Sequence, residues 1–417
     1  MSTELFVNAR IFTPIDSGGP SAGKRQGELA YFDKGAILVK EGLIAKIGDE
    51  KSVLAALTSE EQAHAYDCAG KCVVPGFVDP HTHNCFAALR ENEFELRIGG
   101  TPYLEILRRG GGILSSVKSV AAADVEMLAA TTEKQIRRAL KLGTTTMEIK
   151  SGYGLDTENE LKMLDAIHIA AGRTPIDSVA TFLGAHAIPG EFKDRSDDFI
   201  SLIIEEMLPA VKAQGIAEHC DIFCEEGVFS ISQGRTLLSA ALEAGLKIKL
   251  HADEVHDLGG AGLAAELQAL SADHLLAAGD DNLDAMAEAG VVATLLPATA
   301  YSLRKPYARA RTMIEKNLPV ALATDCNPGS SYTESMPFAI GLGIMNMLMT
   351  PAEALTAATL NSAYAIDMAD KVGSLETGKQ ADFVLLDGQS PAILAYHAGV
   401  SPVEAVFKKG KMIDVDH

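Results

Sequence analysis

The stretch Val73-Val74-Pro75-Gly76-Phe77-Val78-Asp79-Pro80-His81-Thr82-His83 decides the fold of this chain. Its apolar part predicts a buried strand over residues 73–79, which ends in two histidines separated by one residue. Because strand side chains alternate between faces, His81 and His83 point the same way from the carboxyl end of that strand. Two imidazoles in this arrangement can hold one metal ion. Taken alone, the motif also fits two surface histidines that follow a strand.

The middle of the chain, residues 71–369, alternates strand-like apolar runs with helical segments. The eight predicted strands are 73–79, 144–149, 179–185, 220–224, 247–251, 271–275, 291–296 and 320–325. Helices are predicted between most of them, for example over 124–142 and 159–171. Eight strand–helix units in one domain predict an α/β fold, a (β/α)8 TIM-like barrel. The alternative is a doubly wound open sheet, but no Gly-x-Gly-x-x-Gly follows the first strand, which disfavours a dinucleotide-binding fold.

The two ends of the chain, residues 1–70 and 370–417, have a different pattern from the middle. Residues 36–40 and 43–47 flank Glu41-Gly42 and predict a hairpin. Residues 381–386 and 405–413 repeat this style of short strands and turns. Because both ends are β-rich and flank a different middle, we predict a small β-sandwich domain formed from both termini.

Composition excludes several classes of protein. The 417 residues include 47% hydrophobic residues, so the chain can bury a large core. Lys and Arg number 36 against 56 Asp and Glu, a net charge of −20, which argues against a nucleic-acid or membrane partner. The six cysteines are too few for a disulfide framework in so long a chain, and buried reduced thiols are expected. The start of the chain has no apolar signal segment, so we expect a cytoplasmic location.

Polar side chains follow most of the predicted strands at their carboxyl ends, where the active sites of barrels lie. In chain order they are His81 and His83, residues 148–153, His186, Glu225 and Glu226, residues 251–254, Asp273 and His274, and residues 325–329. Each one alone fits a hydrogen-bonded core residue or a helix cap. Seven such strand ends on one face predict a single functional site.

Residues 75–83 resemble the metal motif of the amidohydrolase superfamily. Within it, the chain resembles the imidazolonepropionase family of histidine degradation, over most of its length. The stretches that carry this resemblance are Phe94-Glu95-Leu96-Arg97, Gly110-Gly111-Gly112-Ile113, Glu148-Ile149-Lys150-Ser151-Gly152-Tyr153-Gly154-Leu155, Phe182-Leu183-Gly184-Ala185-His186, His251-Ala252-Asp253-Glu254 and Thr324-Asp325-Cys326-Asn327-Pro328-Gly329. The chain departs from the family pattern at Ala88-Leu89, where Gly-Asp is expected before Arg90.

The resemblance implies one divalent or trivalent metal ion per chain. A hydrolytic metal site needs three or four protein ligands and an open position for water. The implied ligands are His81, His83, His251 and Asp325. This set suits zinc and is compatible with iron. Two-metal relatives bridge their ions with a carboxylated lysine on the fourth strand, and residues 220–224 contain no lysine, which predicts one ion.

Three residues are candidates for catalysis at such a site. Glu254 lies three residues after His251 and is expected to act as the general acid and base. Asp325 is expected to share the proton transfer, and His274 to orient the water. The alternatives are a residue beside a helix cap for Glu254 and a hydrogen-bonded core histidine for His274.

The implied substrate is 4-imidazolone-5-propanoate, a cyclic amide with one carboxylate. A metal-activated water would open its ring to N-formimidoyl-L-glutamate. Arg90 is the candidate for the carboxylate, because guanidinium binds carboxylate bidentately, although it could instead pair within the run 90–93. The other implied substrate contacts are Tyr153, His186, Glu254, Asn327, Gly329 and Ser330, and Tyr103 is a further candidate.

Two other functions share parts of this pattern. A metal-dependent aminohydrolase, such as a cytosine- or guanine-type deaminase, would use the same histidines, and Arg90 argues for an acidic substrate instead. A metal-free barrel that serves as a binding or scaffold module would be expected to lose metal ligands, and all four are present. A homodimer is expected from the habits of such enzymes.

Overall fold

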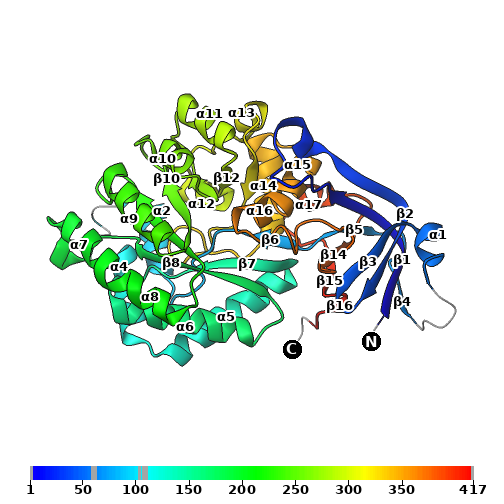
Figure 1. Ribbon diagram of the computed structural model, residues 1–417, viewed down its shortest axis with the longest axis horizontal. Coiled ribbons are helices and arrows are strands. Elements are labelled where there is room, and N and C mark those ends of the chain that lie inside the picture. The colour runs from blue at the N-terminus through cyan, green and yellow to red at the C-terminus, as the bar shows by residue number, and fades with distance from the viewer. Residues whose placement is uncertain (1–2, 58–62, 102–104, 106–110, 415–417) are drawn as a thin grey trace.

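Two sheets of eight strands organise the chain (Figure 1). The computed structural model describes residues 3–57, 63–101, 105 and 111–414. One sheet is the parallel sheet of a barrel, and the other is built from both termini. The predicted α/β class, the (β/α)8 barrel and the small β domain from both termini are therefore confirmed.

The barrel strands follow one another in chain order, and each pairs in parallel with the next. They are β6 (Phe77–Asp79), β7 (Thr144–Lys150), β8 (Asp177–Ala185), β9 (His219–Cys224), β10 (Lys247–Ala252), β11 (Ser271–His274), β12 (Val292–Leu295) and β13 (Val320–Leu322). The helices predicted over 124–142 and 159–171 are α5 (Val125–Lys141) and α6 (Thr157–Gly172). Both begin after an aspartate N-cap, because the side chains of Asp124 and Asp156 accept backbone N–H groups of the first turn.

Side chains and loops connect the first barrel strand to the last. Asp79 accepts the backbone N–H of Thr324 at 3.1 Å and its hydroxyl at 2.5 Å. Just beyond, Thr82 and Cys326 form a parallel bridge, and the backbone N–H of Asp325 donates to the carbonyl of His81. These bonds bring the segments that follow β6 and β13 side by side.

The prediction of a single strand over residues 73–79 is wrong, because this run forms two strands. β5 (Cys72–Pro75) pairs with β1 (Thr3–Pro14) and β14 (Phe383–Leu386) in the terminal sheet, whereas β6 pairs with β7 in the barrel. Gly76 lies between them, and a Cβ there would overlap Thr145 Oγ1 and lie 2.6 Å from its Cγ2. The apolar run is unbroken because both halves are buried, each in a different sheet.

Substituting Gly76→Ala is expected to lower the free energy of unfolding by about 1–3 kcal/mol, because the methyl group overpacks a buried crossing. Urea denaturation followed by circular dichroism measures the change. Gly172→Ala is the matched control, since a Cβ on Gly172, at the end of α6, meets nothing within 4 Å. Equal stability of the two variants would contradict the role assigned to Gly76.

The terminal sheet runs in the order β16-β15-β14-β5-β1-β2-β3, with β4 on β1. Its remaining strands are β2 (Leu29–Lys40), β3 (Leu43–Asp49), β4 (His64–Asp67), β15 (Val403–Lys408) and β16 (Lys411–Met412). Phe6 contacts Phe383 and Phe407 edge-on, with ring centroids 4.7 and 5.0 Å apart, so both ends of the chain share one aromatic core. We propose domain limits near the predicted 1–70, 71–369 and 370–417, with the first crossing at Gly76.

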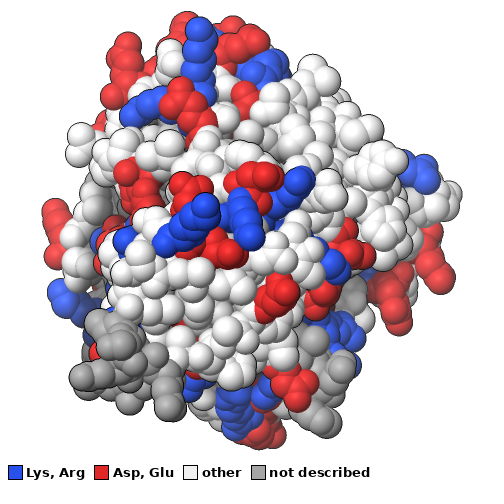
Figure 2. All heavy atoms as spheres, turned by 90° about the vertical axis from the view of Figure 1, so that its right-hand side faces the viewer, with Lys and Arg blue, Asp and Glu red and all other residues white. Residues whose placement is uncertain are grey.

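The surface carries both signs of charge. On the face that the terminal sheet presents, Lys and Arg side chains are interspersed with Asp and Glu (Figure 2). Among the residues that the structure describes, no helix is long and apolar enough to cross a membrane. All six cysteines are buried free thiols, as predicted.

Candidate active site

Four side chains from three parts of the barrel meet at its carboxyl end. His81 Nε2 lies 3.2 Å from His83 Nε2, and His251 Nε2 lies 3.3 Å from the same atom. Asp325 Oδ1 is 3.6 Å from both His81 Nε2 and His83 Nε2. All four are at most 3% exposed. The residues that the sequence predicts as metal ligands therefore lie close together.

The surroundings of these histidines suit a divalent metal. Asp273 holds His81 Nδ1 at 2.6 Å and Asp221 holds His251 Nδ1 at 3.0 Å, which leaves each Nε2 free to face the cluster. Burial lowers the pKa of His81 and of His83 well below the ordinary value, so both imidazoles are neutral and can offer a lone pair. Burial also acts on His251, but Asp221 outweighs it and raises the pKa of that imidazole.

A network of buried charges lies beside the histidines, and the sequence analysis missed it. Lys150 Nζ is 2.9 Å from Glu148 and 2.8 Å from Asp221, and all three side chains are fully buried. Burial opposes the charge of Lys150, but Asp221 and Glu148 raise the pKa of its amine above the ordinary value. Lys249 adds a second ammonium, 3.6 Å from Asp273. A signal existed, because Glu148 and Lys150 are two residues apart on one strand and so share a face.

Glu254 and His274 lie next to each other at the edge of the cluster. Glu254 Oε1 is 3.8 Å from His274 Nδ1, and the Glu254 side chain is 19% exposed. His274 is buried, and its Nδ1 has no hydrogen-bond partner among the described residues. The backbone φ is +81° at His274 and +52° at Asp325, a strained conformation that concentrates at functional sites. Thr299, which the sequence did not indicate, donates its hydroxyl to Asp325 Oδ2 at 2.5 Å.

Arg90 lies in contact with the loop after β13. Its Nε pairs with Glu93 at 3.2 Å and its Nη1 donates to Ser116, so the pairing within the run 90–93 does occur. A Cβ on Gly329 would overlap Arg90 Nη2 and lie 2.5 Å from Cζ. Only glycine therefore allows the guanidinium to approach the backbone here.

Asn327 uses its carboxamide within its own loop. Its Oδ1 accepts the backbone N–H groups of Gly329 at 2.9 Å and Ser330 at 2.7 Å. Its Nδ2 donates to the carbonyl of Asp325 and to the hydroxyl of Ser330. This geometry shapes the loop, and it engages both the Asn327 side chain and the backbone N–H groups of Gly329 and Ser330.

Tyr153 and His186 form an aromatic wall next to the histidines. The His186 ring stacks on His83 with centroids 4.9 Å apart, and Tyr153 lies 5.3 Å from His186. Burial lowers the pKa of His186 to about 3 and raises that of Tyr153, so both side chains are neutral. Glu160, which the sequence did not indicate, accepts three backbone N–H groups of the loop that carries Tyr153. Tyr103 lies outside the described residues.

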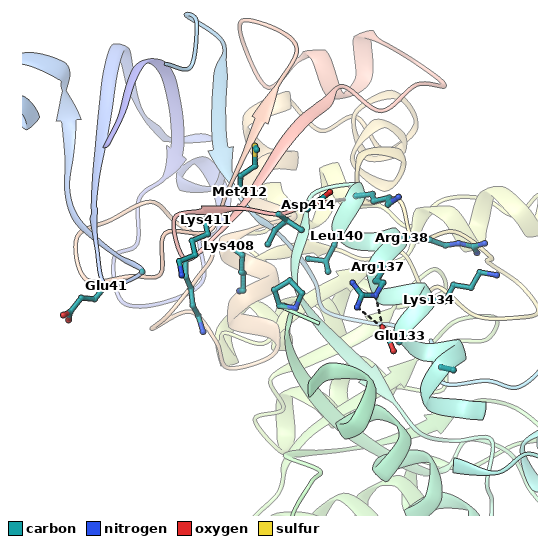
Figure 3. Close-up of a pocket in the computed structure, with 16 residues that line it drawn as sticks. Glu41, Glu133, Lys134, Arg137, Arg138, Leu140, Lys408, Lys411, Met412 and Asp414 are labelled. Carbon is teal, nitrogen blue, oxygen red and sulfur yellow. Dashed lines mark hydrogen bonds and ion pairs between the residues drawn. The ribbon is translucent and has the colours of Figure 1, made fainter. Parts of the chain in front are cut away.

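A larger cavity lies elsewhere, between α5 and the β15–β16 hairpin (Figure 3). It measures about 1130 Å³ and is lined by none of the predicted site residues. Several of its charged side chains form ion pairs. Arg137 pairs with Glu133 (Figure 3), and Lys408 pairs with Asp177 and Asp382. A smaller pocket of about 300 Å³ includes Arg90 and Gly329, and this one adjoins the candidate site.

Known proteins resemble this chain over its whole length. Residues 72–413 match the amidohydrolase family. An imidazolonepropionase from Desulfotalea psychrophila is 64% identical over 413 residues, which cover 99% of this chain and 100% of that one. An imidazolonepropionase from Syntrophobacter fumaroxidans is 60% identical over 98% of this chain and 96% of its own length.

Solved structures share the fold at low identity. A 5-methylcytosine deaminase from Klebsiella pneumoniae has a TM-score of 0.74 at 18% identity, covering 98% of this chain and 97% of that one. A zinc-bound adenosine deaminase from Xanthomonas campestris has a TM-score of 0.72 at 18% identity, covering 99% and 92%. These structural similarities support the fold alone. The two imidazolonepropionases, at 64% and 60% identity over nearly the full chain, show the family. The chain belongs to the amidohydrolase family and, within it, to the family of the imidazolonepropionases.

Proposed function

We propose that this chain hydrolyses 4-imidazolone-5-propanoate to N-formimidoyl-L-glutamate, a step of histidine degradation. The observation that carries the proposal is that His83 Nε2 lies within 3.6 Å of two other imidazole Nε2 atoms and of one carboxylate oxygen, beside the partly exposed Glu254. His81, His83, His251 and Asp325 would hold one zinc or iron ion, as the three imidazoles and one carboxylate allow. Such an ion lowers the pKa of a bound water and polarises the substrate carbonyl.

The chemistry requires one proton to move from water to the leaving nitrogen. The bond between the ring carbonyl carbon and its nitrogen breaks, and the water oxygen becomes part of the new carboxylate. Glu254 would take the proton from water and return it to that nitrogen, a role that its partly accessible position at the edge of the cluster supports. His274 would orient the water. Asp325, whose Oδ2 accepts the Thr299 hydroxyl, would share the proton.

Substituting Glu254→Gln is expected to lower kcat by roughly 10²–10⁴-fold, because the amide cannot accept the proton. Metal content should stay at the wild-type level, since Glu254 is not among the proposed ligands. Initial rates at saturating substrate, with metal analysis of the same sample, check both points. Glu226→Gln is a suitable control, because that side chain is 69% exposed. A kcat within twofold of wild type would remove Glu254 from the proposed mechanism.

The substrate carboxylate would bind beside the loop after β13. We propose that Arg90 supplies the charge, that Gly329 and Ser330 lie beside the carboxylate in the loop that Asn327 shapes, and that Tyr153 and His186 line the ring. Burial keeps the last two neutral, which suits contacts to an uncharged ring.

Substituting Gly329→Ala is expected to raise KM by about ten- to hundredfold, because the methyl group displaces the Arg90 guanidinium from its place against the backbone. The change in kcat should be much smaller than the change in KM. Steady-state kinetics give both values, and Gly190→Ala serves as control since a Cβ there meets nothing within 4 Å. An unchanged KM would argue against a carboxylate site at Arg90.

The test of the function is incubation of metal-assayed protein with freshly prepared 4-imidazolone-5-propanoate. Loss of the ultraviolet absorbance, with a product heavier by one water and no ammonia, is the expected result. Release of ammonia would instead favour the aminohydrolase alternative. A cytoplasmic location, a homodimer and a single ion per chain stay predictions, which fractionation, sedimentation and metal analysis can check.

A further inference from the structure

Arg97 belongs to the Phe94-Glu95-Leu96-Arg97 stretch of α2 (Glu91–Ile98), and the proposed mechanism gives it no part. Its Nη1 donates to the carbonyl of Gly329 at 3.4 Å, and its Nη2 donates to Ser302 at 3.3 Å. Its guanidinium also lies over the Phe94 ring, 5.4 Å from the centroid. Arg90 and Arg97 therefore both contact Gly329, the former at the Cα and the latter at the carbonyl oxygen.

In the part of the chain that the structure describes, the positive charges of Arg90 and Arg97 are not matched by an equal number of carboxylate partners. Glu93 pairs with Arg90 Nε, and both of its oxygens also accept the backbone N–H of Gly112. Within the described ranges Arg97 has no carboxylate partner, and its Nε is buried without a hydrogen bond. Burial and the neighbouring Arg90 both lower the pKa of Arg97, which reflects the cost of holding two cations together. Glu93 thus pairs with one of the two guanidinium groups, that of Arg90.

An arriving anion would relieve this imbalance. Two nearby cations in a partly desolvated pocket attract an anion more strongly than either does in water. The adjoining pocket of about 300 Å³ has Arg90, Glu91, Phe94, Ser302 and Gly329 among its lining residues. Arg97 lies behind this lining, in contact with Phe94, Ser302 and Gly329. The contacts to Gly329 and Ser302 also hold α2 against the loop after β13 and against α12 (Pro297–Leu303).

We propose that Arg97 is a second cation for recognition of the substrate's carboxylate, which positions Gly329 and adds its charge to that of Arg90. This inference rests on the proposed function, because it takes the anion to be the propanoate group. It predicts that Arg97 contributes to the preference for an acid over its uncharged amide, and contributes little to binding of the ring itself.

The test compares two probes, 3-(imidazol-4-yl)propanoate and its carboxamide, by calorimetric titration of the metal-loaded protein. In Arg97→Gln, the preference for the acid over the carboxamide is expected to fall by about five- to tenfold, with carboxamide affinity unchanged. Arg97→Lys should recover part of the preference, because it keeps the charge. Arg195→Gln is the matched control, since Arg195 also lies 5.3 Å from a phenylalanine ring but belongs to a distant helix start.

An unchanged preference in Arg97→Gln would overturn the proposal. An equal loss of affinity for both probes would also overturn it, because that result assigns Arg97 a purely structural role. Wild-type turnover of 4-imidazolone-5-propanoate is measured separately. Failure of the wild-type enzyme to turn over the substrate would contradict the proposed function, whereas normal turnover with an unchanged acid preference would contradict only the role of Arg97.

Discussion

Substituting His251→Ala is expected to lower turnover by on the order of 10³-fold or more, because several kcal/mol of transition-state stabilisation depend on the metal site. The variant removes one of three imidazoles whose Nε2 atoms lie within 3.3 Å of a neighbour. It also leaves Asp221 buried with one partner fewer. Metal content should fall from about one ion per chain, as measured by plasma mass spectrometry on the purified protein.

His168→Ala is the control for this experiment, since His168 is an exposed residue of α6 away from the cluster. It should keep both metal and rate. Wild-type metal content together with wild-type turnover in His251→Ala would contradict the assignment of the cluster as the metal centre.

Substituting Lys150→Met is expected to lower the free energy of unfolding by about 3–5 kcal/mol, the usual cost of removing one partner from a buried ion pair. Glu148 and Asp221 would lose the ammonium that lies 2.9 and 2.8 Å away, in a region without solvent. Because Asp221 also holds His251, metal affinity should fall by about ten- to hundredfold. Denaturation and chelator competition measure the two effects separately.

Lys316→Met provides the comparison for Lys150→Met. Lys316 pairs with Asp284 at the surface, where the carboxylate is 52% exposed, and such pairs contribute less than about 1 kcal/mol. Equal and small losses of stability in the two variants would contradict a stabilising role for the buried network.

The fold was largely predictable because the patterns of apolar residues typical of strands and of helices are both strong in this sequence. Alternating apolar strands and helices indicated the barrel, and the hairpin-like ends indicated the second sheet. The exception is the run 73–79, in which Gly76 separates two strands of different sheets. Period-two patterning cannot reveal this division, because the apolar residues on both sides are buried whichever sheet they join.

The candidate site was predictable only in part. His81, His83, His251 and Asp325 follow from strand ends and from the family resemblance, and the structure brings them together. The contacts that hold them do not follow, because the sequence places Lys150 at a strand end but does not show which carboxylates it meets. Pairing of Lys150 with Asp221 joins residues 71 positions apart, a contact that depends on β7 and β9 lying on either side of β8 in the sheet.

The most direct test of the account is hydrolysis of 4-imidazolone-5-propanoate in water enriched in oxygen-18, followed by mass analysis of the product. We expect N-formimidoyl-L-glutamate with one heavy oxygen, in the carboxylate formed from the ring carbonyl, and turnover by His251→Ala lower by on the order of 10³-fold or more. Ammonia release, or intact substrate in the presence of one bound ion per chain, would contradict it.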